Sequence, residues 1–178
     1  MRSDRVRLFA MAFVVAAVVV LVDQVTKAAV IAGLSETERI PILGDLLGLQ
    51  LAFNPGAILS LGSSATWLLT LLGVIATVFL VVTATHARSA GWAVGIGLIL
   101  GGALGNLIDR LFSPPGFARG QVTDFLAYGN LFIGNLADIA LGAGAIVLAL
   151  ALLSRSQRTR EVPAADRAAN EPEATVTA

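Results

Sequence analysis

Long apolar stretches alternate with short polar segments along this chain. Four of them approach the roughly 20 residues that a helix needs to cross about 30 Å of hydrocarbon. The first continues past a polar DQVTK segment, and the last is apolar except for Asn135 and Asp138. The pattern therefore predicts an all-α membrane protein with four transmembrane helices, at about 8–30, 67–85, 92–109 and 134–154.

The composition agrees with this class. Of the 178 residues 56% are hydrophobic and 13% are charged, whereas soluble domains carry about 25% charged residues. The 12 basic and 12 acidic residues balance, so the chain lacks the basic stripe that nucleic acid would need. The sequence contains no cysteine, which excludes disulfides, thiolate metal sites and a cysteine nucleophile. A Ser-His-Asp triad would depend on the single histidine, His86.

Basic residues near the ends of the spans predict the orientation. With the N-terminus inside, seven of them lie on the cytoplasmic side and four on the outer side, which favours both termini in the cytoplasm. The first apolar stretch is followed by Asp-Gln rather than by a small-residue cleavage site, so we expect a retained helix. The outer loops are then 31–66 and 110–133, and the polar segment 155–178 is predicted to be a disordered cytoplasmic tail.

The first outer loop has a composition of its own. Between about 34 and 63 it combines glycines with short apolar runs such as IPIL and LGLQLAF. Short apolar runs bounded by turn residues are typical of strands. We therefore expect a small β-like platform on the extracytoplasmic side, between the first and second helices.

The uncommon polar residues of this chain fall at one level in the predicted topology. They lie at the outer ends of the first, third and fourth spans and in the two outer loops. A charged group at this depth is costly and is usually turned toward a bundle interior or a water-filled cavity. The pattern predicts one polar site slightly below the outer membrane surface.

Three acids in this site have different surroundings in the sequence. Asp109 precedes Arg110 at a helix end, which favours a local ion pair. Asp124 and Asp138 have no adjacent base. If these two face each other, like charges in a low-dielectric site cannot both ionise and the pair shares a proton. Such a pair performs aspartic hydrolysis without metal or other cofactor, but it also fits a hydrogen bond between elements that has no catalytic role.

Five ordered blocks resemble the lipoprotein signal peptidases, also called signal peptidase II. They are VDQVTK at 22–27, NPGA at 54–57, GGALGNLIDR at 101–110, VTDF at 122–125 and GNLAD at 134–138. The resemblance implies a membrane-embedded aspartic endopeptidase of the bacterial plasma membrane that globomycin inhibits. It implies cleavage of diacylglyceryl-modified prolipoproteins just before the lipidated cysteine, by an enzyme that we expect to be monomeric in the bilayer.

The same resemblance assigns roles residue by residue. Asp124 and Asp138 match the catalytic dyad. The positions that match supporting or substrate-binding residues are Asp23, Lys27, Asn54, Gly56, Asn106, Asp109, Arg110, Asn135 and Ala137. Three departures concern the shape of the groove: Ile58-Leu59 replaces the usual Ala-Phe, Thr123 replaces a commoner Val, and Gly134 replaces the usual Phe.

Two other functions compete with the peptidase. A proton or ion relay should cross the bilayer, whereas the acids share one level. A membrane phosphotransferase would need metal-binding acids or several basic groups around a phosphate, and the site offers Lys27 and Arg110 at most. Small residues recur every fourth position at Ala93, Gly97, Gly101 and Gly105, which predicts close helix packing within the bundle in preference to a homodimer.

Overall fold

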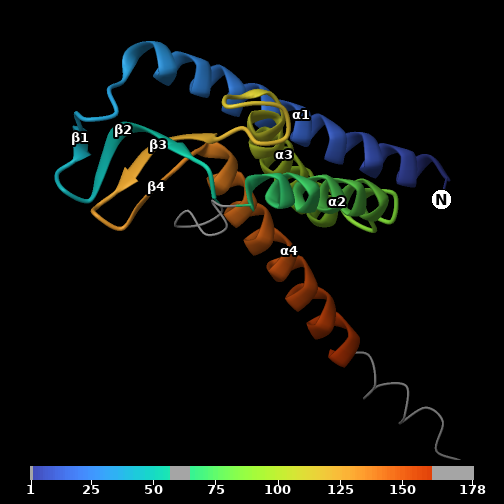
Figure 1. The fold of residues 1–178 in the computed structure, drawn as a ribbon. Coiled ribbons are helices and arrows are strands. Elements are labelled where there is room, and N and C mark those ends of the chain that lie inside the picture. The colour runs from blue at the N-terminus through green and yellow to red at the C-terminus, as the bar shows by residue number, and fades with distance from the viewer. Residues whose placement is uncertain (1, 57–64, 162–178) are drawn as a thin grey trace, which may run out of the picture.

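The computed structural model describes residues 2–56 and 65–161 and contains four long helices (Figure 1). All four are long and apolar enough to cross a membrane, which confirms the predicted number of spans. The Ile58-Leu59 departure and the end of the tail, 162–178, lie outside the described residues. The helices are α1 (Arg2–Gly33), α2 (Thr66–Ala84), α3 (Ala90–Phe112) and α4 (Leu136–Glu161).

Helix α3 is the centre of the bundle, because α1, α2 and α4 all pack against it. Its small residues permit this close approach. A Cβ added at Gly97 would lie 2.6 Å from the carbonyl oxygen of Ala12, and one added at Gly101 would lie 2.6 Å from Cβ of Val19. The stripe of small residues on α3 therefore packs against α1, as the sequence predicts for contacts within the bundle.

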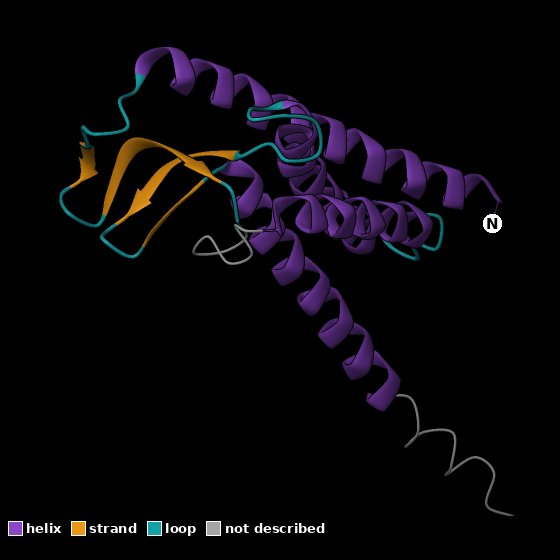
Figure 2. Cartoon of the chain, in the orientation of Figure 1, coloured by secondary structure: helices purple, strands orange, loops and turns teal. Residues whose placement is uncertain are grey.

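A four-stranded antiparallel sheet lies at one end of the bundle, beside the end of α1 and the start of α4 (Figure 2). The first two strands come from the segment between α1 and α2, where a platform was expected, and the other two come from the segment between α3 and α4. In spatial order the strands are β1 (Ile40–Leu43), β2 (Leu47–Asn54), β3 (Val122–Tyr128) and β4 (Phe132–Gly134).

The sheet corrects two expectations: the protein is not all-α, and the platform does not come from the first outer loop alone. Strand β3 and most of β4 lie in 110–133, which the sequence predicts to be an outer loop. Strand β3 reads VTDFLAY, and most of its side chains are buried on both faces of the strand. A strand that is covered on both sides does not alternate between polar and apolar residues. The periodicity on which strand prediction depends is therefore absent from β3.

The pairing of β2 with β3 positions two of the predicted site residues. Asp124 is the register partner of Ala52, and Asn54 is the partner of Val122 two positions along. Asp124 thus lies in a strand and not in a flexible loop. Helix α4 continues through 155–161, a segment that the sequence predicts to belong to the disordered tail.

Candidate active site

The amine of Lys27 is the centre of a buried polar cluster between α1 and α3. Its Nζ lies 2.9 Å from Oδ2 of Asp23 and 2.8 Å from Oδ2 of Asp109, and it donates a hydrogen bond of 3.0 Å to Oδ1 of Asn106. All three donors of the ammonium group therefore have an acceptor. Because Lys27 is 3% exposed and Asp23 is fully buried, the charges stabilise one another away from water.

The two carboxylates of this cluster also bind backbone amides of other elements. Oδ2 of Asp109 accepts a hydrogen bond of 3.0 Å from the amide of Thr123, and Oδ1 of Asp23 accepts one of 3.0 Å from the amide of Ala137. Each amide belongs to the residue immediately before one of the predicted dyad acids, Asp124 and Asp138. The cluster thus fixes the backbone of β3 and of α4 at the two positions that present these acids.

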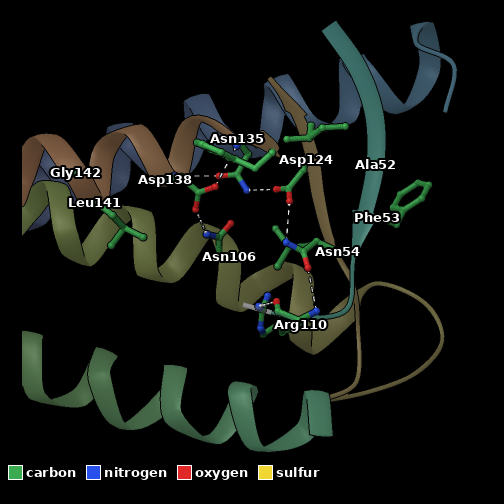
Figure 3. Close-up of a pocket in the computed structure, with 14 residues that line it drawn as sticks. Ala52, Phe53, Asn54, Asn106, Arg110, Asp124, Asn135, Asp138, Leu141 and Gly142 are labelled. Carbon is green, nitrogen blue, oxygen red and sulfur yellow. Dashed lines mark hydrogen bonds between the residues drawn. The ribbon is translucent and has the colours of Figure 1, made fainter. Parts of the chain in front are cut away.

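Asp124 is buried and accepts a hydrogen bond from a different asparagine at each of its oxygens. The side-chain amide of Asn135 donates to Oδ1 at 2.6 Å, and the side-chain amide of Asn54 donates to Oδ2 at 3.1 Å (Figure 3). Burial raises the pKa of Asp124 to about 6, the two asparagine bonds oppose the increase, and the nearby charge of Asp138 adds to it. Desolvation is the largest cause, because it penalises the charged form.

Asp138 occupies the first turn of α4 and forms a capping box with Asn135. The backbone amide of Asp138 donates to Oδ1 of Asn135 at 3.0 Å, and the backbone amide of Asn135 donates to Oδ2 of Asp138 at 3.2 Å. The remaining carboxylate oxygen of Asp138, Oδ1, accepts a hydrogen bond of 3.0 Å from Nδ2 of Asn106. Lys27 holds the other end of the same asparagine side chain, so the cluster also orients the partner of Asp138.

Both acids line one cavity of about 800 Å³ at the junction of the sheet, α3 and α4 (Figure 3). Asn135 connects them, because its side chain donates to Asp124 and its oxygen accepts from the backbone of Asp138. Seven of the predicted site residues line the cavity: Asn54, Gly56, Asn106, Arg110, Asp124, Asn135 and Asp138. The other four, Asp23, Lys27, Asp109 and Ala137, belong to the cluster behind it.

Arg110 has a different partner from the one that the sequence suggested. Its Nη2 donates to the carbonyl oxygen of Gly56, and its Nη1 is buried without a hydrogen-bond partner among the described residues. Asp109 pairs with Lys27 in place of the adjacent Arg110. The prediction of a local Asp109–Arg110 pair is therefore wrong, because the two side chains lie on different sides of α3.

Sequence reasoning did not assign a site role to Gln24. Its Nε2 lies within hydrogen-bond distance of Oδ2 of Asp23, of the Gly105 carbonyl oxygen and of Oδ1 of Asp109, at 3.1–3.2 Å. Gln24 belongs to the VDQVTK block, and membership of that block was the sequence signal for its role.

In the described ranges, 2–56 and 65–161, no group of three or more His, Cys, Asp or Glu residues has the arrangement of a metal site.

A family profile described as Signal peptidase (SPase) II matches residues 15–154. This chain belongs to the signal peptidase II family. Two relatives, each named lipoprotein signal peptidase, come from Leifsonia xyli subsp. xyli and Rhodococcus jostii. The first is 50% identical over 129 residues, 72% of this chain and 60% of the relative. The second is 42% identical over 141 residues, 79% of this chain and 71% of the relative.

The fold of this signal peptidase II family member is also similar to that of a solved bacterial membrane enzyme, whose structure was obtained by the in meso method at 2.3 Å resolution. The TM-score is 0.75 with 26% sequence identity, and the match covers 85% of this chain and 93% of that chain.

Proposed function

We propose that this protein is an aspartic endopeptidase that removes the signal peptide from diacylglyceryl-modified prolipoproteins and cleaves just before the lipidated cysteine. The observation that carries the proposal is that Asp124 and Asp138 line one cavity and are linked through Asn135. Membership of the signal peptidase II family supports the substrate class.

The different surroundings of the two acids suggest their roles. Asp124 is buried, and burial favours its protonated form, so we assign it as the general acid. Asp138 is exposed where Asp124 is buried, and we assign it as the base that activates water. Two carboxyls in different environments divide acid and base roles in this way.

In the proposed reaction, water attacks the scissile carbonyl carbon and gives a proton to Asp138, while Asp124 donates its proton to the carbonyl oxygen. The resulting gem-diol collapses when Asp138 protonates the leaving nitrogen and a hydroxyl proton returns to Asp124. The C–N bond breaks, and the products are the free carboxylic acid of the signal peptide and the amine of the lipidated cysteine. Both aspartates recover their starting protonation.

Two features of the cavity suit this substrate. Arg110 lines the cavity, and its guanidinium lies within electrostatic reach of Asp124 and Asp138, so it is a donor for a substrate carbonyl oxygen. Phe53, Phe132 and Leu141 add apolar surface to the cavity wall, as an apolar signal peptide requires.

We further propose that the protein is a monomer in the bacterial plasma membrane, with both termini in the cytoplasm and the cavity near the outer face.

The test is incubation of the purified protein with a lipidated prolipoprotein, followed by mass spectrometry. We expect a loss of mass equal to the signal peptide, inhibition by globomycin, and no loss of activity in EDTA. Asp124→Asn and Asp138→Asn should each lower cleavage by about a thousandfold or more, whereas Asp45→Asn, at an exposed turn, should cleave like the parent. Full cleavage by either dyad variant would contradict the mechanism.

A further inference from the structure

Gly142 is a cavity residue that the mechanism does not use. It lies on α4 four positions after Asp138, so the two residues share one face of the helix, about 6 Å apart along the axis. Both line the same cavity. Because α4 begins at the sheet and runs away from it (Figure 1), Gly142 lies one turn farther from the sheet than the acid.

Packing does not require glycine at this position. A Cβ added at the nearby Gly144 would lie 2.6 Å from Cγ1 of Ile99 and 2.8 Å from the carbonyl oxygen of Gly95, so Gly144 permits close contact between α4 and α3. A Cβ added at Gly142 would meet no atom within 4 Å. Glycine inside a helix costs about 1 kcal/mol relative to alanine. The fold therefore gains nothing from Gly142, and the space that it leaves open belongs to the cavity.

The surroundings of this space define what it can bind. Leu141 lines the cavity next to Gly142 and Phe132 faces the same cavity from the sheet, while the surrounding span carries no charged residue from Ile139 to Ser154. An uncharged, apolar recess at membrane depth favours an aliphatic group over a polar one.

We propose that Gly142 is a specificity-determining residue that admits a bulky aliphatic group of the substrate one helical turn inward from the scissile bond. This inference rests on the proposed function. The group is either a side chain of the signal peptide shortly before the cleavage point or an acyl chain of the diacylglyceryl cysteine. Both have the same aliphatic chemistry, and both extend from the scissile bond into the membrane.

The test is a size series at this position, Gly142→Ala and Gly142→Leu, with kcat/KM measured on lipidated prolipoproteins. We expect a stepwise loss that reaches about tenfold or more with leucine. Gly142→Ala should show no decrease in Tm, because its Cβ meets no atom within 4 Å, whereas Gly144→Ala should lower Tm. Ala28→Leu places the same leucine side chain at an exposed position of α1 outside the cavity, and should leave kcat/KM unchanged.

Two substrate series identify the bound group. In one, leucines at the three positions before the lipidated cysteine are replaced by alanine; in the other, the acyl chains are shortened. In one of the two series, the ratio of kcat/KM for Gly142→Leu to that for the parent enzyme should rise toward one. The group that was shortened in that series is the group that occupies the recess. Equal kcat/KM for the parent and Gly142→Leu on every substrate, or the same fractional loss on all of them, would overturn the inference. Failure of the parent enzyme to cleave any substrate would contradict the proposed function instead.

Discussion

Asp124 and Asp138 carry the same functional group but receive different hydrogen bonds. Asp124 accepts from two side-chain amides, whereas Asp138 accepts from one side chain and one backbone amide and belongs to a helix cap. The acids could be selected from the sequence, because neither has a neighbouring base. The sequence also placed Asn54 and Asn106 at the site, but it could not pair each asparagine with its acid, since Asn54 is 70 positions from Asp124 and Asn106 is 32 positions from Asp138.

The raised pKa of Asp124 predicts a pH dependence of stability. In the unfolded chain this carboxyl titrates near 3.8, and in the folded protein near 6, so between these values the folded state binds more protons. Its contribution is therefore fully present below pH 3.8 and is lost as the pH rises through about 6. The shift corresponds to roughly 3 kcal/mol in the free energy of unfolding.

Comparison of the parent with Asp124→Asn isolates this contribution. Unfolding of both proteins in detergent is followed by tryptophan fluorescence from pH 4 to 8. We expect the free energy of unfolding of the parent to decrease relative to that of the variant, mostly between pH 4 and 6. A difference that does not change with pH would mean that Asp124 titrates at its ordinary value in the folded protein.

Among the elements, α1 has the largest share in organising the site although it lines none of the cavity. Asp23 and Lys27 lie one helical turn apart, so their side chains meet on the same face of α1. Through Asp23, Asp109 and Asn106 the amine of Lys27 connects α1 to α3, β3 and α4. The DQVTK motif therefore helps to hold the backbone of β3 and α4 beside Asp124 and Asp138, and we expect its effect on catalysis to be indirect.

This arrangement predicts the effect of removing the central cation. Lys27→Met leaves Asp23 and Asp109 as buried carboxylates without their positive partner, which should destabilise the protein by roughly 3–5 kcal/mol. The double variant Lys27→Met with Asp109→Asn removes one of the two negative charges and should recover part of that loss. Thermal unfolding in detergent measures both effects.

Arg5→Met is the matched control for the lysine substitution, because Arg5 is an exposed cation on the same helix. We expect it to change stability by less than about 0.5 kcal/mol. If Lys27→Met were as mild as Arg5→Met, or if the double variant were less stable than Lys27→Met alone, the carboxylates would not depend on the lysine charge.

In the whole molecule, the sheet and the turn between α2 and α3 lie at opposite ends of the bundle (Figure 1). The excess of basic residues near the N-terminus and the α2–α3 turn predicts that this end faces the cytoplasm. In this proposed topology the sheet and the cavity are on the outer side, where we expect the proposed lipid-modified substrate to be held by the outer leaflet.

The absence of cysteine from the sequence permits a direct test of this orientation. Single cysteines are introduced at exposed positions, Asp45→Cys and Asn130→Cys in the sheet turns and His86→Cys after α2. A membrane-impermeant maleimide applied to cells, or to spheroplasts where an outer membrane is present, should label the first two and not the third. After permeabilisation all three should react, which verifies access. The opposite pattern would invert the topology.

The sequence by itself determined the number of spans and, except for Gln24, which polar side chains meet at the site. Span length and hydropathy are local properties of a helix, and the rare polar residues of an apolar chain have few places to lie. Only the tertiary structure decided that β2 and β3 form one sheet, that Asp109 pairs with Lys27, and that Gly142 opens into the cavity. The physical reason is sequence separation: the contacts that set these features join distant segments, up to 114 positions apart between Asp23 and Ala137. Such contacts depend on how helices and strands pack, which no local pattern records.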